Sequence, residues 1–199
     1  MGRRDEAEAT YRAGVEREGF GSPITLAFDD YFKEAGDVAG RRRVLEAALM
    51  RDPADATLRT RLGEIALESG ERERGLKWLK EAVALEPASA AANAALGFYY
   101  RNHGDAAAAV GYLERARAAS PGADPYRILL ADAYIETGRY RDALGELDEV
   151  DEPARLPKAL ALRAKAYYNL GDGKAAAAAA SRALELDPEL IEAEEFAVE

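Results

Sequence analysis

Apolar residues recur three or four positions apart along most of this chain, which is the spacing of an amphipathic α-helix. The apolar runs are short, and turn-forming residues separate them, as at Asn102-His103-Gly104-Asp105. The whole arrangement returns at a fixed interval, and the turn glycines Gly70 and Gly104 are 34 residues apart. This periodicity predicts a tandem array of helix-turn-helix repeats, in which neighbouring repeats bury each other's apolar faces.

Five successive repeats share a turn glycine, and four of them also share a small residue in the first helix and another early in the second helix. Their predicted ranges are 22–55, 56–89, 90–123, 124–156 and 157–190. Gly63 and Gly97 stand where the two helices of a repeat are expected to approach most closely. Asp55, and Asp124 before Pro125, are expected to cap helix starts by accepting backbone N–H bonds.

Three repeats depart from the pattern. In the first, Asp29 replaces the small residue and Arg41 replaces alanine, which we interpret as the polar outer face that an end repeat requires. In the fourth, an early proline predicts that the second helix stops near Asp151. In the fifth, residues 175–180 are all alanine. Because alanine favours helix and Asp172 can cap it, we expect a helix there.

Both ends of the chain lie outside the repeats. Residues 1–21 predict an amphipathic N-terminal capping helix, with a flexible extension as the alternative. Residues 191–199 predict a closing helix or a truncated sixth repeat. No apolar stretch has signal-peptide length, and no run of about 18 apolar residues occurs. No signal peptide or membrane insertion is therefore expected, and a cytoplasmic location is the default, with the compartment left open.

Composition limits the partners of the chain. The 199 residues are 48% hydrophobic but include only five Phe and one Trp, which suits closely packed, thin helices. The net charge of −10 repels nucleic acid and anionic lipid, and no basic cluster is interleaved with aromatics. Nucleic-acid binding is therefore not expected. The absence of cysteine excludes disulfides and thiolate metal sites.

Catalytic chemistry has few candidates. The single histidine, His103, stands in a turn, where a solvated residue is the expected role, and no cysteine is present. The acidic stretch 148–152 lacks the alternating ligands and central glycine of a calcium loop. No glycine-rich loop follows a strand, so no phosphate site is predicted. We expect no enzyme activity, no cofactor and no metal.

The repeats resemble the tetratricopeptide repeat (TPR) family over residues 22–190. The family's first signature tryptophan is missing from every repeat. The resemblance implies an all-α fold, a right-handed superhelical solenoid of antiparallel helix pairs, with a concave groove lined by the first helix of each pair. One known family site binds a C-terminal carboxylate through an asparagine. Its position is held here by Asp30, Glu64, Phe98, Asp132 and Lys165, so that site is absent.

The resemblance also assigns candidate partner-binding residues along the groove. These are Arg61, Glu64, Leu67, Glu68, Phe98, Arg101, Asn102, Asp132, Ile135, Glu136, Lys165 and Tyr168. Among them, Leu67, Phe98, Ile135 and Tyr168 are expected to be displayed as apolar anchors. Acids outnumber bases in the second and fourth repeats, which favours a partner that carries some Lys or Arg.

These features predict a non-enzymatic scaffold for protein–protein interaction. Its expected partner is another protein, bound in the groove as a peptide or an amphipathic helix with apolar anchors. One alternative is a self-associating, homo-oligomeric scaffold. Another is a regulatory repeat array of a larger enzyme or assembly complex.

Overall fold

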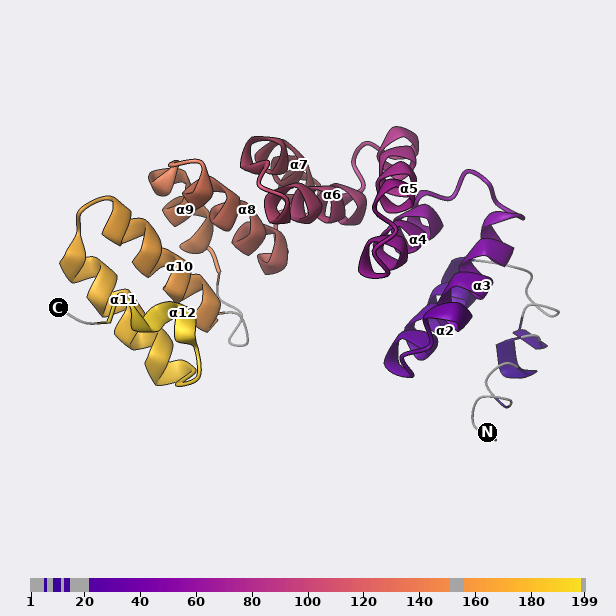
Figure 1. The fold of residues 1–199 in the computed structure, drawn as a ribbon, viewed down its shortest axis with the longest axis horizontal. Coiled ribbons are helices and arrows are strands. Elements are labelled where there is room, and N and C mark those ends of the chain that lie inside the picture. Colours follow the sequence, from indigo (N-terminus) through magenta and orange to yellow (C-terminus); the bar gives the residue numbers. More distant parts are fainter. Residues whose placement is uncertain (1–5, 7–8, 12, 15–21, 151–155, 198–199) are drawn as a thin grey trace. The chain divides into compact units, whose positions relative to one another are not determined.

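The computed structural model describes residues 6, 9–11, 13–14, 22–150 and 156–197, and within these ranges all regular elements are helices. Within these ranges, short turns join the two helices of each pair, which lie side by side and antiparallel (Figure 1). The elements are α2 (Ser22–Glu34), α3 (Val38–Leu49), α4 (Ala56–Glu68), α5 (Arg72–Leu85), α6 (Ala90–Asn102), α7 (Ala106–Ala119), α8 (Asp124–Glu136), α9 (Tyr140–Leu147), α10 (Leu156–Asn169), α11 (Gly173–Leu186) and α12 (Ile191–Glu194).

The chain divides into two compact units, Met1–Ala95 and Leu96–Glu199, with the boundary inside α6. The N-terminal unit has a core around Phe32, Leu45 and Ile65. The C-terminal unit has one core around Leu113 and Leu130 and a second, made largely of alanine, between α10 and α11. Each unit is described by itself below.

The turn glycines explain the fixed period. Gly36, Gly70, Gly104, Gly138 and Gly171 all have positive φ, between 69° and 80°. L-residues rarely adopt this conformation, whereas glycine adopts it freely. After Gly70, for example, the amide of Glu71 donates to the carbonyl of Ala66 at 2.8 Å, which closes the helix end. One glycine at this point of every repeat therefore ends the first helix and sets the start of the second.

Helix packing within a repeat depends on the predicted small residues. A Cβ on Gly63 would lie 2.7 Å from Cγ of Leu79, and one on Gly97 would lie 2.5 Å from Cγ of Leu113. Both distances are shorter than side chains tolerate. The prediction that the helices approach most closely at these two glycines is therefore confirmed.

The alanine-rich helix is also present, as predicted. α11 spans the alanine run, and Asp172 caps it by accepting a hydrogen bond from the Ala175 amide at 3.0 Å. Asp55 likewise caps α4 through the Leu58 amide at 2.9 Å. The predicted cap at Asp124 is wrong: Ala123 holds that position without a side-chain bond, and Asp124 is the first helical residue.

Other boundaries differ from the prediction. α9 ends at Leu147, earlier than Asp151, because the chain turns there and places Val150 in the core, where it is 5% exposed. The looser link predicted at 151–156 lies almost entirely outside the described residues. Most of the predicted helix at 1–21 does too, although the Tyr11 ring lies 4.6 Å from that of Phe28.

Asp29 and Arg41 do not form a polar outer face. Both are buried, at 0% and 3% exposure, and they pair with each other. The expectation for the first repeat is therefore wrong at these two positions, because the charges compensate each other inside the helix pair.

Candidate functional site

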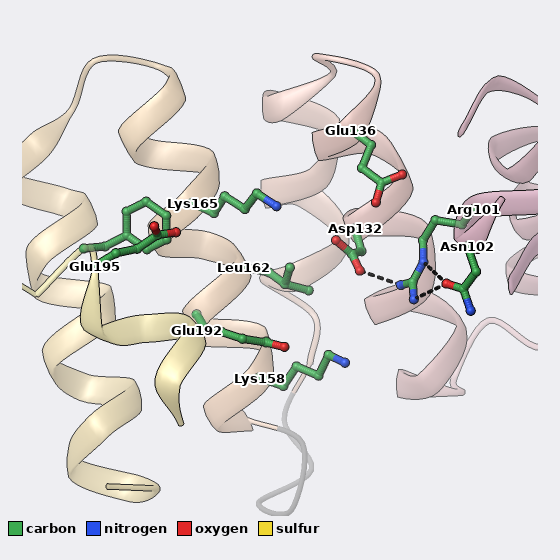
Figure 2. Close-up of a pocket in the computed structure, with 11 residues that line it drawn as sticks. Arg101, Asn102, Asp132, Glu136, Lys158, Leu162, Lys165, Glu192 and Glu195 are labelled. Carbon is green, nitrogen blue, oxygen red and sulfur yellow. Dashed lines mark hydrogen bonds and ion pairs between the residues drawn. The ribbon is translucent and has the colours of Figure 1, made fainter. Parts of the chain in front are cut away.

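A pocket of about 430 Å³ in the C-terminal unit brings together five predicted groove residues (Figure 2). They come from the end of α6, from α8 and from α10. The five are Arg101, Asn102, Asp132, Glu136 and Lys165. The segment after α11 forms the remaining wall, and Ala161 and Leu162 of α10 contribute apolar surface.

Arg101 is held in place by its neighbours. Its Nη1 lies 2.5 Å from Oδ2 of Asp132, and its Nη2 donates to Oδ1 of Asn102 at 3.0 Å. The guanidinium also lies 5.2 Å from the ring centroid of Phe98. Charge-assisted bonds of this kind fix a long side chain in one geometry. Arg101 and Asp132 therefore shape the pocket wall and compensate each other's charge.

Two lysines on α10 line the pocket without forming an ion pair to any residue that the structure describes. Lys158 and Lys165 are seven residues apart, about two helical turns, and both line the pocket. Within the described part of the chain neither makes an ion pair at 4.0 Å or less. In Figure 2 the Lys165 ammonium points toward α8.

The sequence prediction included Lys165 but missed Lys158, Glu192, Glu195 and Phe196. The seven-residue spacing to Lys165 was the available signal for Lys158, because it places both lysines on one helix face. Nothing in the sequence indicated the other three, because their place depends on where the chain returns after α11.

Two of the four predicted anchors are displayed. Phe98 is 47% exposed and Tyr168 is 62% exposed. Ile135 is not displayed: it is 4% exposed and packs in the main core of its unit. Leu67 is half-buried, because it fills the space beside Gly75, where a Cβ would lie 2.6 Å from its Cγ. The expectation that Ile135 and Leu67 are free anchors is wrong.

The groove residues of the N-terminal unit form a charge network. Arg61 Nη1 lies 3.5 Å from Oδ1 of Asp30, and Arg41 Nη1 donates to Oε2 of Glu68 at 3.2 Å. Burial raises the pKa of Glu64 above its ordinary value, while Arg61 opposes the shift. Glu68 is thus already paired within the chain.

His103, the single histidine, lies in the turn between α6 and α7. His103 is exposed, and its Nδ1 lies 2.7 Å from the Tyr99 carbonyl oxygen, which only accepts. Among the residues described, no group of His, Asp and Glu is arranged to hold a metal ion. None of the described helices is long and apolar enough to cross a membrane.

Family models match most of the chain. Models described as tetratricopeptide repeat match residues 30–90, 62–124, 101–166 and 157–190. The chain belongs to the tetratricopeptide repeat family. Its fold class is accordingly an all-α, TPR-like helical solenoid, as predicted. None of the curated protein sequences compared with it matches.

Solved TPR structures share this fold at low sequence identity. PilW, a type IV pilus biogenesis factor, has a TM-score of 0.74 at 19% identity, covering 98% of this chain and 90% of its own. YrrB has a TM-score of 0.72 at 15% identity, covering 93% and 96%. MamA has a TM-score of 0.67 at 23% identity, covering 84% and 92%. At these identities the likeness shows the shared fold.

Proposed function

We propose that this TPR protein is a non-enzymatic scaffold that binds a peptide or partner helix at the pocket of its C-terminal unit. The observation that carries the proposal is the exposure of two aromatic residues, Phe98 at 47% and Tyr168 at 62%. Phe98 contacts Arg101 and Tyr168 contacts Phe196, and both of these neighbours line the pocket. Exposed aromatics at a concave polar surface are typical binding hot spots. YrrB, which shares the fold, is described as having an unusual peptide-binding site.

The charge argument for a basic partner is weaker than the sequence suggested. Of the four acids behind it, Glu68 is paired with Arg41 and Asp132 with Arg101. A carboxylate that is already paired offers little to a partner's lysine. The proposal therefore rests on the aromatic anchors, with Arg101, Asn102, Glu136 and Lys165 as the polar rim.

The test is affinity capture with the variant Phe98→Ala/Tyr168→Ala. Both side chains are largely exposed, so their loss should leave helicity and Tm nearly unchanged while removing the captured partner. The control is Met50→Ala, which truncates an 81% exposed apolar residue that does not line the pocket. Retention of the same partner by the double variant would contradict the proposal.

Self-association is the alternative within binding proteins. Light scattering coupled to size exclusion separates it from capture of another protein. A molar mass equal to one chain at all concentrations supports the scaffold proposal, and a mass that rises with concentration supports self-association.

A further inference from the structure

The chain segment 190–197, hereafter the tail segment, lies against both helices of the last pair, α10 and α11. Its Ala193 is 0% exposed and packs in one cluster with Ala161 and Ala164 of α10 and Ala180 and Ala183 of α11. The methyl side chains let the tail backbone approach both helices closely. The tail segment thus packs on a surface made largely of alanine side chains, hereafter the alanine seat.

An aromatic contact adds to this seat. The Phe196 ring lies 5.4 Å from the Tyr168 ring, at an interplanar angle of 54°. Tyr168 is the more exposed of the two anchors assigned to partner binding above. Part of the surface proposed for the partner is therefore already covered by the chain's own phenylalanine.

The acids of the tail segment face the pocket. Glu192 and Glu195 line it, as do Lys158 and Lys165 of α10 (Figure 2). Both acids line the pocket, while Ala193 and Phe196 pack with the alanine cluster of α10 and α11. The tail segment thus has the features that this surface would recognise in a ligand.

The tail segment is also weakly held. Its helix, α12, has 4 residues, which is too short to be stable without support. Ile191 is 76% exposed. Within the described chain, Glu192 and Glu195 make no ion pair at 4.0 Å or less. Its attachment therefore depends on the apolar packing of Leu190, Ala193, Phe196 and Ala197, and a ligand that adds charge contacts could replace it.

We propose that the tail segment is an intramolecular ligand, and that the partner is an acidic segment of another protein that displaces it. The partner segment would place a small residue on the alanine seat and an aromatic ring, three residues later, on Tyr168. Its carboxylates would face Lys158 and Lys165. This inference rests on the proposed function and specifies the partner's chemistry at the same site.

The test uses the full chain and a fluorescent peptide with the sequence of residues 188–199, followed by anisotropy. The unmodified chain should bind the peptide weakly, because its own tail segment competes. Phe196→Ala loosens that segment and should strengthen peptide binding at least tenfold. Adding Lys158→Glu and Lys165→Glu to Phe196→Ala should abolish the gain. Raising the salt concentration should weaken binding.

Two control peptides define the recognition. One replaces its phenylalanine by alanine, and the other replaces the glutamates at the positions of Glu192 and Glu195 by lysine. Both should bind at least tenfold more weakly than the original peptide. Equal binding of the lysine peptide would overturn the acidic specificity.

If Phe196→Ala binds the peptide no more tightly than the unmodified chain, the tail segment does not compete with the peptide and is a fixed cap. Hydrogen exchange guards against a folding artefact: α10 amides should keep their protection in Phe196→Ala while those of 190–197 lose it. If the tail amides of the unmodified chain are as protected as those of α10, the segment is not displaceable. In either case the capture experiment with Phe98→Ala/Tyr168→Ala still tests the proposed function independently.

Discussion

Arg41 Nε lies 2.7 Å from Asp29 Oδ1, and the two side chains are 4% and 0% exposed. One repeat later the same positions are held by Gly63 and Gly75, where a Cβ on Gly63 would lie 3.2 Å from the carbonyl oxygen of Gly75. The first repeat therefore replaces a close contact between glycines by a buried ion pair between the same two helices.

Removal of one partner from this pair should be costly. Asp29→Ala or Arg41→Ala leaves a buried charge without its main partner, and each should lose about 3–5 kcal/mol of unfolding free energy. Asp29→Ala/Arg41→Ala should lose less than the sum of the single variants, because it leaves neither charge behind. Urea unfolding followed by circular dichroism measures the difference.

The control pair is Arg182 and Glu185, 2.6 Å apart but about 60% exposed, where near-zero coupling is expected. Additive losses at Asp29 and Arg41 would contradict the account.

Gly97→Leu tests the close helix approach. The added side chain meets Leu113, so overpacking should cost about 1–3 kcal/mol. Gly122→Ala is the control, because nothing lies within 4 Å of a Cβ there and its φ is not positive. Thermal unfolding should show a clear drop in Tm for the first variant only. Equal shifts would mean that the helix register is wrong.

Two glycine-to-alanine variants test whether the turn glycines are needed for their positive φ. A Cβ added at Gly104 or at Gly111 would meet no atom within 4 Å, but Gly104 has a φ of 78°. Gly104→Ala should therefore destabilise by about 1 kcal/mol through backbone strain alone. Gly111→Ala, inside α7, should stabilise by about 0.5–1 kcal/mol. Chemical denaturation measures both changes in unfolding free energy. Changes of opposite sign support this explanation of the repeat period, and changes of the same sign contradict it.

The carboxyl group of Glu64 should make the stability of the fold depend on pH. Burial raises its folded-state pKa above the unfolded value of 4.5. The protonated form is therefore favoured by folding, and this contribution is complete below pH 4.5 and is lost as the pH rises through the folded pKa. Glu64→Gln should accordingly raise Tm at pH 7, and the gain should vanish below pH 4.5. Glu136→Gln, at an exposed carboxylate, is the control. A lower Tm for Glu64→Gln at pH 7 would show that the nearby charges of Arg61 and Lys33 outweigh burial.

The sequence predicted the helices well, because Gly70 and Gly104 mark turns and Gly63 and Gly97 mark contacts that only small residues satisfy. It failed where a residue's role depends on how deeply it is buried or on contacts with segments distant in the sequence. Asp29 and Arg41 looked exposed, because nothing in the pattern shows that they face each other. Ile135 shares the groove register yet lies in the core. The tail segment's place on α10 follows only from three-dimensional packing.

The central claim, that a partner binds at the C-terminal pocket, is tested most directly by site-specific photo-crosslinking. A photoreactive phenylalanine at Glu136, an exposed residue lining the pocket, should give a covalent adduct with the captured partner. The adduct should disappear in the Phe98→Ala/Tyr168→Ala background. The same probe at Met50, which is 81% exposed and does not line the pocket, should give none. Adducts from Met50 but not from position 136 would contradict the account.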